Sequence, residues 1–200
     1  MKNLLVVPLV LLSVYVIADE RVILGSLELH TEDVEIEHAG TSVKSALNGF
    51  GVQFFRFADS GYYFGGKFSR LTGDSESCVR SHCLPSNTDF SQTIFSGEMG
   101  WSYGDWTPFF GISFVDEDSR GESADYSSFT TGAWLAFDAF RLRGAITKTQ
   151  LTDFSSSRTW VSGGFLYPMA NDWALSADFG TEIQGDRDGF RFSFQFGRTL

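Results

Sequence analysis

The chain has 200 residues, enough for one domain, and its 25 acidic against 15 basic side chains give a formal net charge of −10. A strongly acidic protein repels polyanions, so nucleic acid is excluded as an electrostatic partner. Beyond the N-terminus there is no run of about 18 apolar residues, which excludes a bundle of membrane-spanning helices. Mean hydropathy is near zero, at −0.06. Such an average misses a membrane β-barrel, in which apolar residues occupy every second position.

The N-terminus has the features of a secretory signal peptide over residues 1–18. Lys2 precedes the apolar stretch Leu4–Ile17, and Ala18 supplies the small residue of a cleavage site. We expect cleavage after Ala18, which leaves residues 19–200 as a single mature domain. A membrane anchor is the alternative, and the short apolar run disfavours it.

Period-2 alternation of apolar and polar residues, typical of β-strands, runs through nearly all of the mature chain. In Phe190–Phe196, for example, four phenylalanines alternate with Arg191, Ser193 and Gln195. We expect ten strands, in chain order at residues 22–30, 47–57, 61–71, 90–103, 106–115, 126–137, 140–149, 158–167, 173–181 and 189–197. Eight would result if the first strand packed elsewhere.

Short and long connections alternate between these strands. Tight turns are expected near residues 59–60, 104–105, 138–139 and 168–171, and longer polar stretches at residues 31–46, 72–89, 116–125, 150–157 and 182–188. This alternation is typical of outer-membrane barrels, which have short periplasmic turns and long external loops. The sequence therefore predicts an all-β, antiparallel, up-and-down transmembrane barrel. An even strand number would place both termini in the periplasm.

Amphipathic aromatic residues gather near the tight turns, as expected of a girdle at the membrane interface. The expected girdle comprises Tyr62, Tyr63, Trp101, Tyr103, Trp106, Tyr167 and Trp173.

The C-terminal strand resembles that of the small Gram-negative outer-membrane barrels, the superfamily of the OmpA transmembrane domain and OmpX. Gly189, Phe192, Phe194 and Phe196 match that family's assembly signal, although the chain continues for four residues beyond Phe196 rather than ending on an aromatic residue. The resemblance implies an outer-membrane location and recognition by the barrel-assembly machinery. It also implies contact with outer-membrane lipids and lipopolysaccharide, and it identifies no external ligand or cofactor.

The two cysteines, Cys78 and Cys83, lie in a polar stretch between two expected strands. In an oxidising compartment such an isolated pair predicts a local disulfide. A metal site made of Cys78, His82 and Cys83 is the alternative, but it lacks a fourth ligand.

If the apolar faces of the strands contact lipid, charged side chains face the lumen. The expected lumen network comprises Glu28, Lys67, Glu98, Arg141, Arg143, Asp178 and Arg191. From residue counts along each strand, we expect Lys67 beside Glu98, and Arg191 between Asp178 and Glu28. A narrow barrel filled by paired charges, with Trp134 and Trp160 also pointing inward, favours a plugged structural or interaction protein. A narrow channel for small solutes is the alternative.

Candidate catalytic residues are few. The only histidines are His30, His38 and His82, and none lies in the C-terminal half, where a serine–histidine site would need one.

Acidic residues gather in the expected external loops, at Glu32, Asp33, Glu35 and Glu37 and again at Asp116, Glu117, Asp118, Glu122 and Asp125. Such clusters keep loops solvated, or bind divalent cations weakly. We expect neither an enzyme nor a built metal site.

Overall fold

The structure, a computed structural model, describes residues 19–36, 41–79, 82–119, 122–150, 157–184 and 187–200. Ten strands account for nearly all of them: β1 Glu20–Ile36, β2 Thr41–Phe57, β3 Tyr62–Val79, β4 His82–Trp101, β5 Trp106–Ser119, β6 Glu122–Ala136, β7 Arg141–Gln150, β8 Ser157–Pro168, β9 Trp173–Gln184 and β10 Arg187–Thr199. A single 3-10 turn, η1 (Ala170–Asp172), precedes β9. Within the described ranges, no helix is long and apolar enough to cross a lipid bilayer. The expected signal peptide lies outside them and stays a prediction.

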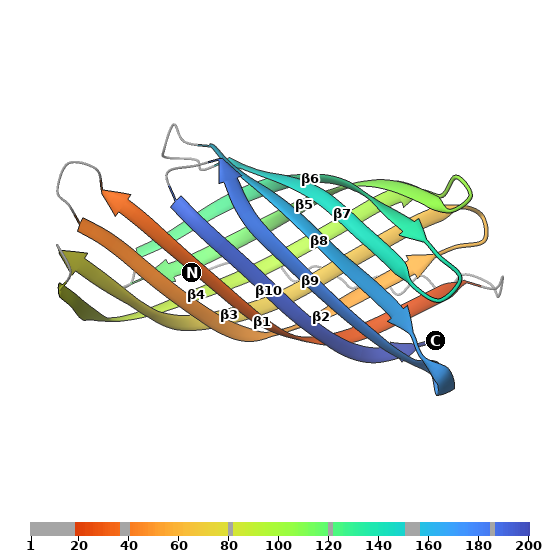
Figure 1. Ribbon diagram of the computed structural model, residues 1–200, viewed down its shortest axis with the longest axis horizontal. Helices are drawn as coiled ribbons and strands as arrows, with labels where there is room; N and C mark the ends of the chain where they lie inside the picture. Colours follow the sequence, from red (N-terminus) through yellow and green to blue (C-terminus); the bar gives the residue numbers. More distant parts are fainter. Residues whose placement is uncertain (1–18, 37–40, 80–81, 120–121, 151–156, 185–186) are drawn as a thin grey trace, which may run out of the picture.

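Each strand pairs antiparallel with its sequence neighbours, and β1 pairs with β10, so the sheet closes into a barrel (Figure 1). The closing seam is long, running from Val22 opposite Thr199 to Val34 opposite Arg187. Closure leaves no unpaired strand edge in the barrel wall. The predicted ten-strand, up-and-down barrel is confirmed.

The two ends of the barrel differ. The four tight turns lie where the sequence predicts them, together with the start of β1 and the C-terminus; we call this the turn end. Gly61 and Gly104 occupy two of these turns with φ values of +90° and +63°, which other residues rarely adopt. The opposite end, which holds the end of β1 and the start of β10, is called the hairpin end.

The expectation of long loops at the hairpin end is wrong for four of the five polar stretches, and residues 151–156 of the fifth lie outside the described residues. The polar stretches continue as paired strands: β1 and β2 pair as far as Ile36 opposite Thr41, and β3 and β4 as far as Val79 opposite His82. The acidic residues Asp116, Glu117 and Asp118 likewise lie in β5. Backbone pairing does not require apolar side chains, so a polar strand end can resemble a loop in sequence.

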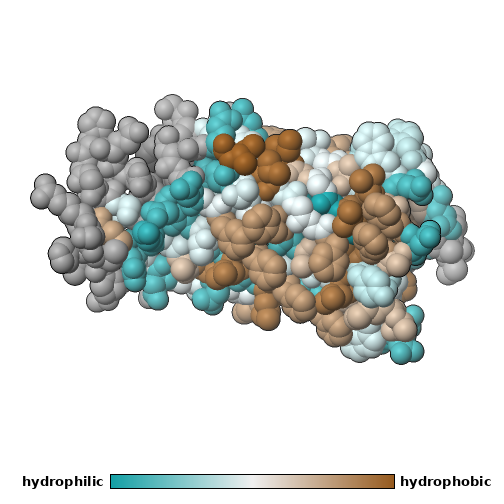
Figure 2. All heavy atoms as spheres, in the orientation of Figure 1, coloured by the Kyte–Doolittle hydropathy of each residue, from teal (hydrophilic) through white to brown (hydrophobic). Residues whose placement is uncertain are grey.

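The outer surface carries a belt of apolar side chains, and along β10 Phe192, Phe194 and Phe196 all face outward. In Figure 2 this belt crosses the middle of the visible face, with hydrophilic residues toward the hairpin end. Six of the seven aromatic residues expected in the girdle are exposed near the turn end: Tyr62, Trp101, Tyr103, Trp106, Tyr167 and Trp173. Tyr63 is the exception, because it is fully buried inside the barrel. Tyr62 and Tyr63 are consecutive in β3, and consecutive strand residues point to opposite faces.

Gly132 on β6 and Gly144 on β7 lie close together but face opposite sides of the barrel wall, so alanine substitutions at the two positions test which face of each strand points inward. A Cβ atom at Gly132 would overlap the Gly144 carbonyl and lie 2.7 Å from the Phe109 ring, whereas a Cβ at Gly144 meets nothing within 4 Å. Gly132→Ala should therefore destabilise the folded barrel by about 1–3 kcal/mol, as overpacking does, and Gly144→Ala should be nearly neutral. The urea midpoint for loss of heat-modifiable gel mobility measures both effects. Equal midpoints for the two variants would contradict the assigned strand faces.

The register supports the disulfide without showing it. Cys78 lies directly opposite Cys83, and directly opposed residues of antiparallel strands have Cα atoms about 4.5–5.5 Å apart, within the range of a disulfide. The side chain of Cys83 is outside what the structure describes. We predict that both thiols of membrane-extracted protein resist alkylation until a reductant is added. Strong labelling without a reductant would contradict the pairing and reopen the metal alternative.

Candidate functional site: the barrel interior

The interior layer nearest the turn end is aromatic. Phe55, Phe57, Tyr63, Phe109 and Trp134 are all buried there, and we call them the lower aromatic cluster. The Trp134 ring meets Phe55 and Phe57 edge-on at centroid distances of 5.2 Å and 5.7 Å, a favourable arrangement for aromatic pairs. Because β2 and β6 are four strands apart in the barrel, these rings meet across the bore.

Ion pairs lie at the mouth of the turn end, beyond this cluster. Arg141, on β7, extends its guanidinium 2.5 Å from Glu20 on β1, and its Cζ lies 4.1 Å from the centre of the Phe57 ring. Arg56 pairs with Asp19 at 2.5 Å. Arg141 therefore faces the interior as expected, but it belongs to this mouth rather than to the mid-barrel charges.

The middle of the interior holds the remaining charges of the expected lumen network except Arg191. Lys67 Nζ lies 2.8 Å from Glu28 Oε2. Arg143 pairs with Glu98, whose second oxygen accepts a 2.8 Å hydrogen bond from the Tyr63 hydroxyl.

Asp178 completes this middle layer. It accepts a 2.9 Å hydrogen bond from Gln195, and its other oxygen lies 4.0 Å from Arg143. The three ion pairs of this layer join β1 with β3, β4 with β7, and β7 with β9, so they bridge strands that are not neighbours in the wall.

The expected pairing of Arg191 between Asp178 and Glu28 is wrong. Ser193 is the residue directly opposite both carboxylates, whereas Arg191 lies opposite His30 and Gly180, two positions nearer the hairpin end. Residue counts from the turns misplace side chains because barrel strands are tilted and staggered relative to the axis.

The expected pairing of Lys67 with Glu98 is wrong for the same reason. Lys67 lies opposite Ser96, and Glu98 lies opposite Gly65, so the two side chains are offset by two positions along their strands. Each has a partner farther around the barrel instead.

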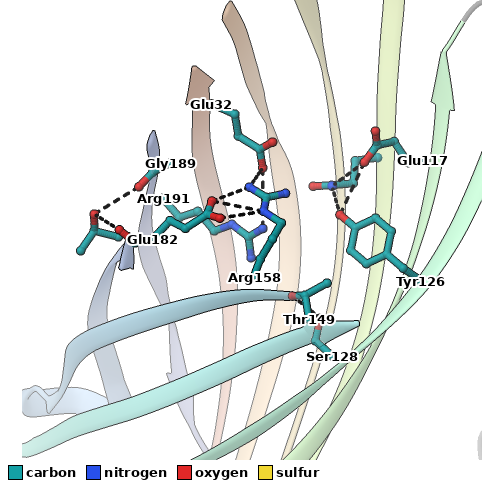
Figure 3. A network of polar contacts seen from close by, with 11 residues as sticks. Glu32, Glu117, Tyr126, Ser128, Thr149, Arg158, Glu182, Gly189 and Arg191 are labelled. Atoms are coloured by element: carbon teal, nitrogen blue, oxygen red, sulfur yellow. Dashed lines mark hydrogen bonds and ion pairs between the residues drawn. The ribbon is translucent and has the colours of Figure 1, made fainter. Parts of the chain in front are cut away.

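A second charged layer, nearer the hairpin end, centres on Arg158 (Figure 3). Its guanidinium lies 2.7 Å from Glu182 and 3.0 Å from Glu32, which reach it from β9 and β1. Arg191 lies 4.0 Å from Glu32, and its Cζ is 4.0 Å from the centre of the Trp160 ring. We call Glu32, Arg158, Trp160, Glu182 and Arg191 the arginine cluster.

Sequence reasoning missed three members of the arginine cluster. Glu32 and Glu182 were assigned to external loops, and Arg158 to the first residue of a strand without a role. The sequence did contain an indication of this cluster. Residues two or four positions apart in a strand point to the same face, so Arg158 should point inward with Trp160, and Glu182 with Asp178.

The wall opposite the arginine cluster is lined by buried apolar side chains, which are Leu47, Leu71, Ile94, Val115 and Tyr126. The Tyr126 hydroxyl accepts a 2.8 Å hydrogen bond from the Gln92 amide (Figure 3).

A chamber of about 170 Å³ lies between the lower aromatic cluster and the arginine cluster. Glu28, Lys67, Glu98, Arg143 and Asp178 line it, together with hydroxyl groups from six strands. A larger hollow of about 870 Å³ opens at the hairpin end, lined by Glu32, Asp33, Asp74 and Glu76 among others.

The histidine nearest to these charges does not form a catalytic arrangement. His30 Nε2 is 3.7 Å from Glu28, and Ser26 Oγ donates to the same carboxylate at 2.9 Å. Ser26 and His30 are four positions apart on one strand, about 13 Å, which is too far for the base of a nucleophile. In the described part of the chain, no group of three His, Cys, Asp or Glu side chains is placed to hold a metal ion. His38 and the side chain of His82 lie outside that part.

No protein-family model matches the sequence, and no curated protein resembles it in sequence. Solved structures do resemble the fold. The β-domain of the Bordetella autotransporter BrkA matches with a TM-score of 0.56 and 10% identity, over 90% of this chain and 99% of that one. The translocator domain of the autotransporter NalP from Neisseria meningitidis matches with a TM-score of 0.54 and 9% identity, over 90% and 88%.

The Ail protein of Yersinia pestis, in complex with a heparin analogue, covers 92% of this chain and 100% of its own at 10% identity, with a TM-score of 0.49. The fold assignment rests on the two autotransporter domains. The chain has the fold of bacterial outer-membrane β-barrels, which confirms the resemblance at the level of fold.

The middle charged layer gives a stability prediction. Arg143→Met leaves Glu98 and Asp178 without their shared cation in a buried site, which should destabilise the barrel by about 3–5 kcal/mol. Arg198→Met is the matched control, because Arg198 and its partner Asp172 are both mostly exposed, and such a pair contributes about 0–1 kcal/mol. Urea unfolding followed by gel mobility distinguishes the two. Adding Glu98→Gln to Arg143→Met should recover part of the loss, and a wild-type midpoint for Arg143→Met would show that these charges are well hydrated.

Proposed function

Given this fold, we propose that the protein is a bacterial outer-membrane barrel of structural or interaction type, whose interior is closed to solutes. Its turn end and both termini face the periplasm, and its hairpin end faces the outside. The exposed apolar belt and the aromatic residues near the turns support a membrane-spanning position. The position of both chain ends at the turn end fits export from the periplasmic side.

The observation that carries the closed interior is the lower aromatic cluster. Barrels of about eight strands are filled by side chains, whereas those of 16–18 strands leave an aqueous channel. Here Trp134 and the rings around it meet across the bore. The ion pair of Arg141 and Glu20 closes the mouth next to them. A solute would have to displace several packed rings to pass.

The polar strands at the hairpin end are the proposed interaction surface. They continue beyond the apolar belt, with outward-facing acidic residues such as Asp116, Asp118 and Asp125. We expect them to lie among the phosphates of lipopolysaccharide, bridged by divalent cations, and to present the surface that an external ligand would contact. The barrel wall would serve as their rigid support.

A narrow channel for small solutes is the second candidate function. It is favoured by the chamber of about 170 Å³ in the interior and by the wider hollow at the hairpin end. Under this alternative, the lower aromatic cluster would open as a gate. Proteolysis has no support in the placement of the described histidine, His30.

Planar-bilayer recording tests the proposal. Purified protein should give no steady openings, because the lower aromatic cluster fills the bore. Trp134→Ala combined with Phe57→Ala should create measurable conductance, whereas Trp173→Ala, which shortens an outward-facing ring, should not. Steady openings from the unmodified protein would overturn the closed-barrel proposal in favour of the channel.

A further inference from the structure

The chamber inside the barrel is partly open. Trp160 and Arg191 line one side of it and Val115 and Tyr126 another, so it reaches from the middle charged layer up between the arginine cluster and the apolar wall. On the turn side the bore is filled by the lower aromatic cluster. The chamber is therefore a blind pocket that opens toward the hairpin end.

The charged side chains that line the chamber balance. They are three carboxylates and three cations, namely Glu28, Glu98 and Asp178 with Lys67, Arg143 and Arg191. An uncompensated charge in a protein interior is energetically unfavourable. A ligand with a net charge would upset the balance, whereas a ligand with one charge of each sign leaves it unchanged.

Two of these six side chains are only loosely paired, and they have opposite charges. Asp178 lies 4.0 Å from Arg143, and Arg191 lies 4.0 Å from Glu32, whereas Arg143 and Glu32 each have a nearer partner. Within the described structure, Asp178 Oδ1 accepts no hydrogen bond and Arg191 Nε donates none. The chamber therefore presents one carboxylate and one guanidinium that can each take a further partner.

Asp178 and Arg191 belong to the same part of the wall and are separated by a gap. Arg191 is opposite Gly180, so Asp178 is two positions, or about 7 Å, nearer the turn end along β9. The Arg191 guanidinium contacts Trp160 on the hairpin side. The wall between the two charged groups is formed by Gly180 and by Ser162 opposite it, both of which line the chamber. These small residues leave room beside them for a ligand that reaches from one charge to the other.

Neutral polar groups in the chamber also have unused hydrogen-bonding capacity. Trp160 is 3% exposed and Gln53 is 8% exposed, yet within the described structure the Trp160 Nε1 donates no hydrogen bond and the Gln53 Oε1 accepts none. A buried polar group without a partner is costly. A ligand that supplies both acceptors and donors would relieve this cost.

The volume of the chamber limits the size of such a ligand. It is about 170 Å³, and an engineered cavity of roughly 150 Å³ holds a benzene molecule. Molecules of about six or seven non-hydrogen atoms therefore fit.

We propose that the chamber binds a small zwitterionic amino acid, such as glycine, alanine or serine, with its ammonium group at Asp178 and its carboxylate at Arg191. Such a ligand has one charge of each sign, has the right size, and offers both donors and acceptors. The inference rests on the proposed function, because it names a ligand class for a barrel that takes up its ligand from the hairpin end and does not conduct it.

Equilibrium dialysis of purified, folded barrel in detergent micelles against radioactive glycine, alanine or serine tests the proposal. At least one of the three should bind saturably, at one molecule per chain. Ethylamine and propionate, which each carry only one of the two charged groups, should compete at least about tenfold more weakly because a charged hydrogen bond is lost. Tryptophan, which exceeds the volume of the chamber, should not compete.

Three variants assign the site. Asp178→Asn and Arg191→Gln should each weaken binding at least about tenfold. Gly180→Ala narrows the gap and leaves every ion pair in place, and its Cβ would meet Ser162 Cβ at 3.4 Å, an ordinary contact. It should therefore fold even if the charge variants do not, and it should weaken the binding of serine more than that of glycine.

Matched controls come from the exposed pair of Arg198 and Asp172 at the turn end. Arg198→Gln and Asp172→Asn remove the same charges far from the chamber and should leave binding unchanged. Heat-modifiable gel mobility shows that each variant is folded.

The proposal is overturned if the folded protein binds none of the three amino acids, because the chamber then holds only water. Binding that every folded variant retains at full strength, or that ethylamine or propionate matches, would also overturn it. Bilayer recording of the same preparation separates this inference from the proposed function. A silent barrel that binds no amino acid refutes the amino-acid site alone, and a conducting barrel refutes the closed interior whether or not it binds.

Discussion

The structure depends on filling the bore of a ten-strand barrel, and glycines make that filling possible. Where a large side chain crosses the bore, the adjoining wall position is a glycine: a Cβ at Gly65 would lie 2.6 Å from the Tyr63 hydroxyl, and one at Gly189 would overlap the Trp160 ring. Gly189 was noted from the sequence as part of an assembly signal. Its place against Trp160 gives it a packing role as well.

Filling the bore also dictates how its charges are arranged. An ion pair in a poorly hydrated interior is stable only when both partners are well placed, because removing either one exposes an uncompensated buried charge. The observed pairs mostly join strands that are not adjacent, such as β4 with β7 and β1 with β8. They therefore link separate parts of the wall across the interior, as the rings of the lower aromatic cluster do near the turn end. This arrangement is the physical basis for proposing a supporting barrel before a channel.

The outer face obeys a different constraint from the inner one. Lipid-facing positions need only be apolar, so they are occupied by many interchangeable side chains such as Phe192 and Phe194. Inner positions must fit one another in size and charge. Beyond the apolar belt both constraints relax, and the strands continue as polar ladders up to Ile36 and Val79. This explains why the hairpin end is well paired despite a sequence that resembles loops.

The sequence by itself determined the architecture. Alternation with period two and the short turns at the turn end specified ten strands, their order, and which parity faces outward, because these are local properties of each strand. The inward direction of Glu28, Arg143, Trp134 and Trp160 followed from the same parity. Tyr63 was misplaced only where that rule was not applied to two consecutive tyrosines.

Only the tertiary structure decided which charges meet. The partners of Arg191, Lys67 and Asp178 depend on the stagger between strands and on reach across the bore, and neither is encoded in the spacing along one strand. The arginine cluster was hidden for a related reason, since Glu32 and Glu182 lie in polar strand ends whose sequence does not differ from that of a loop.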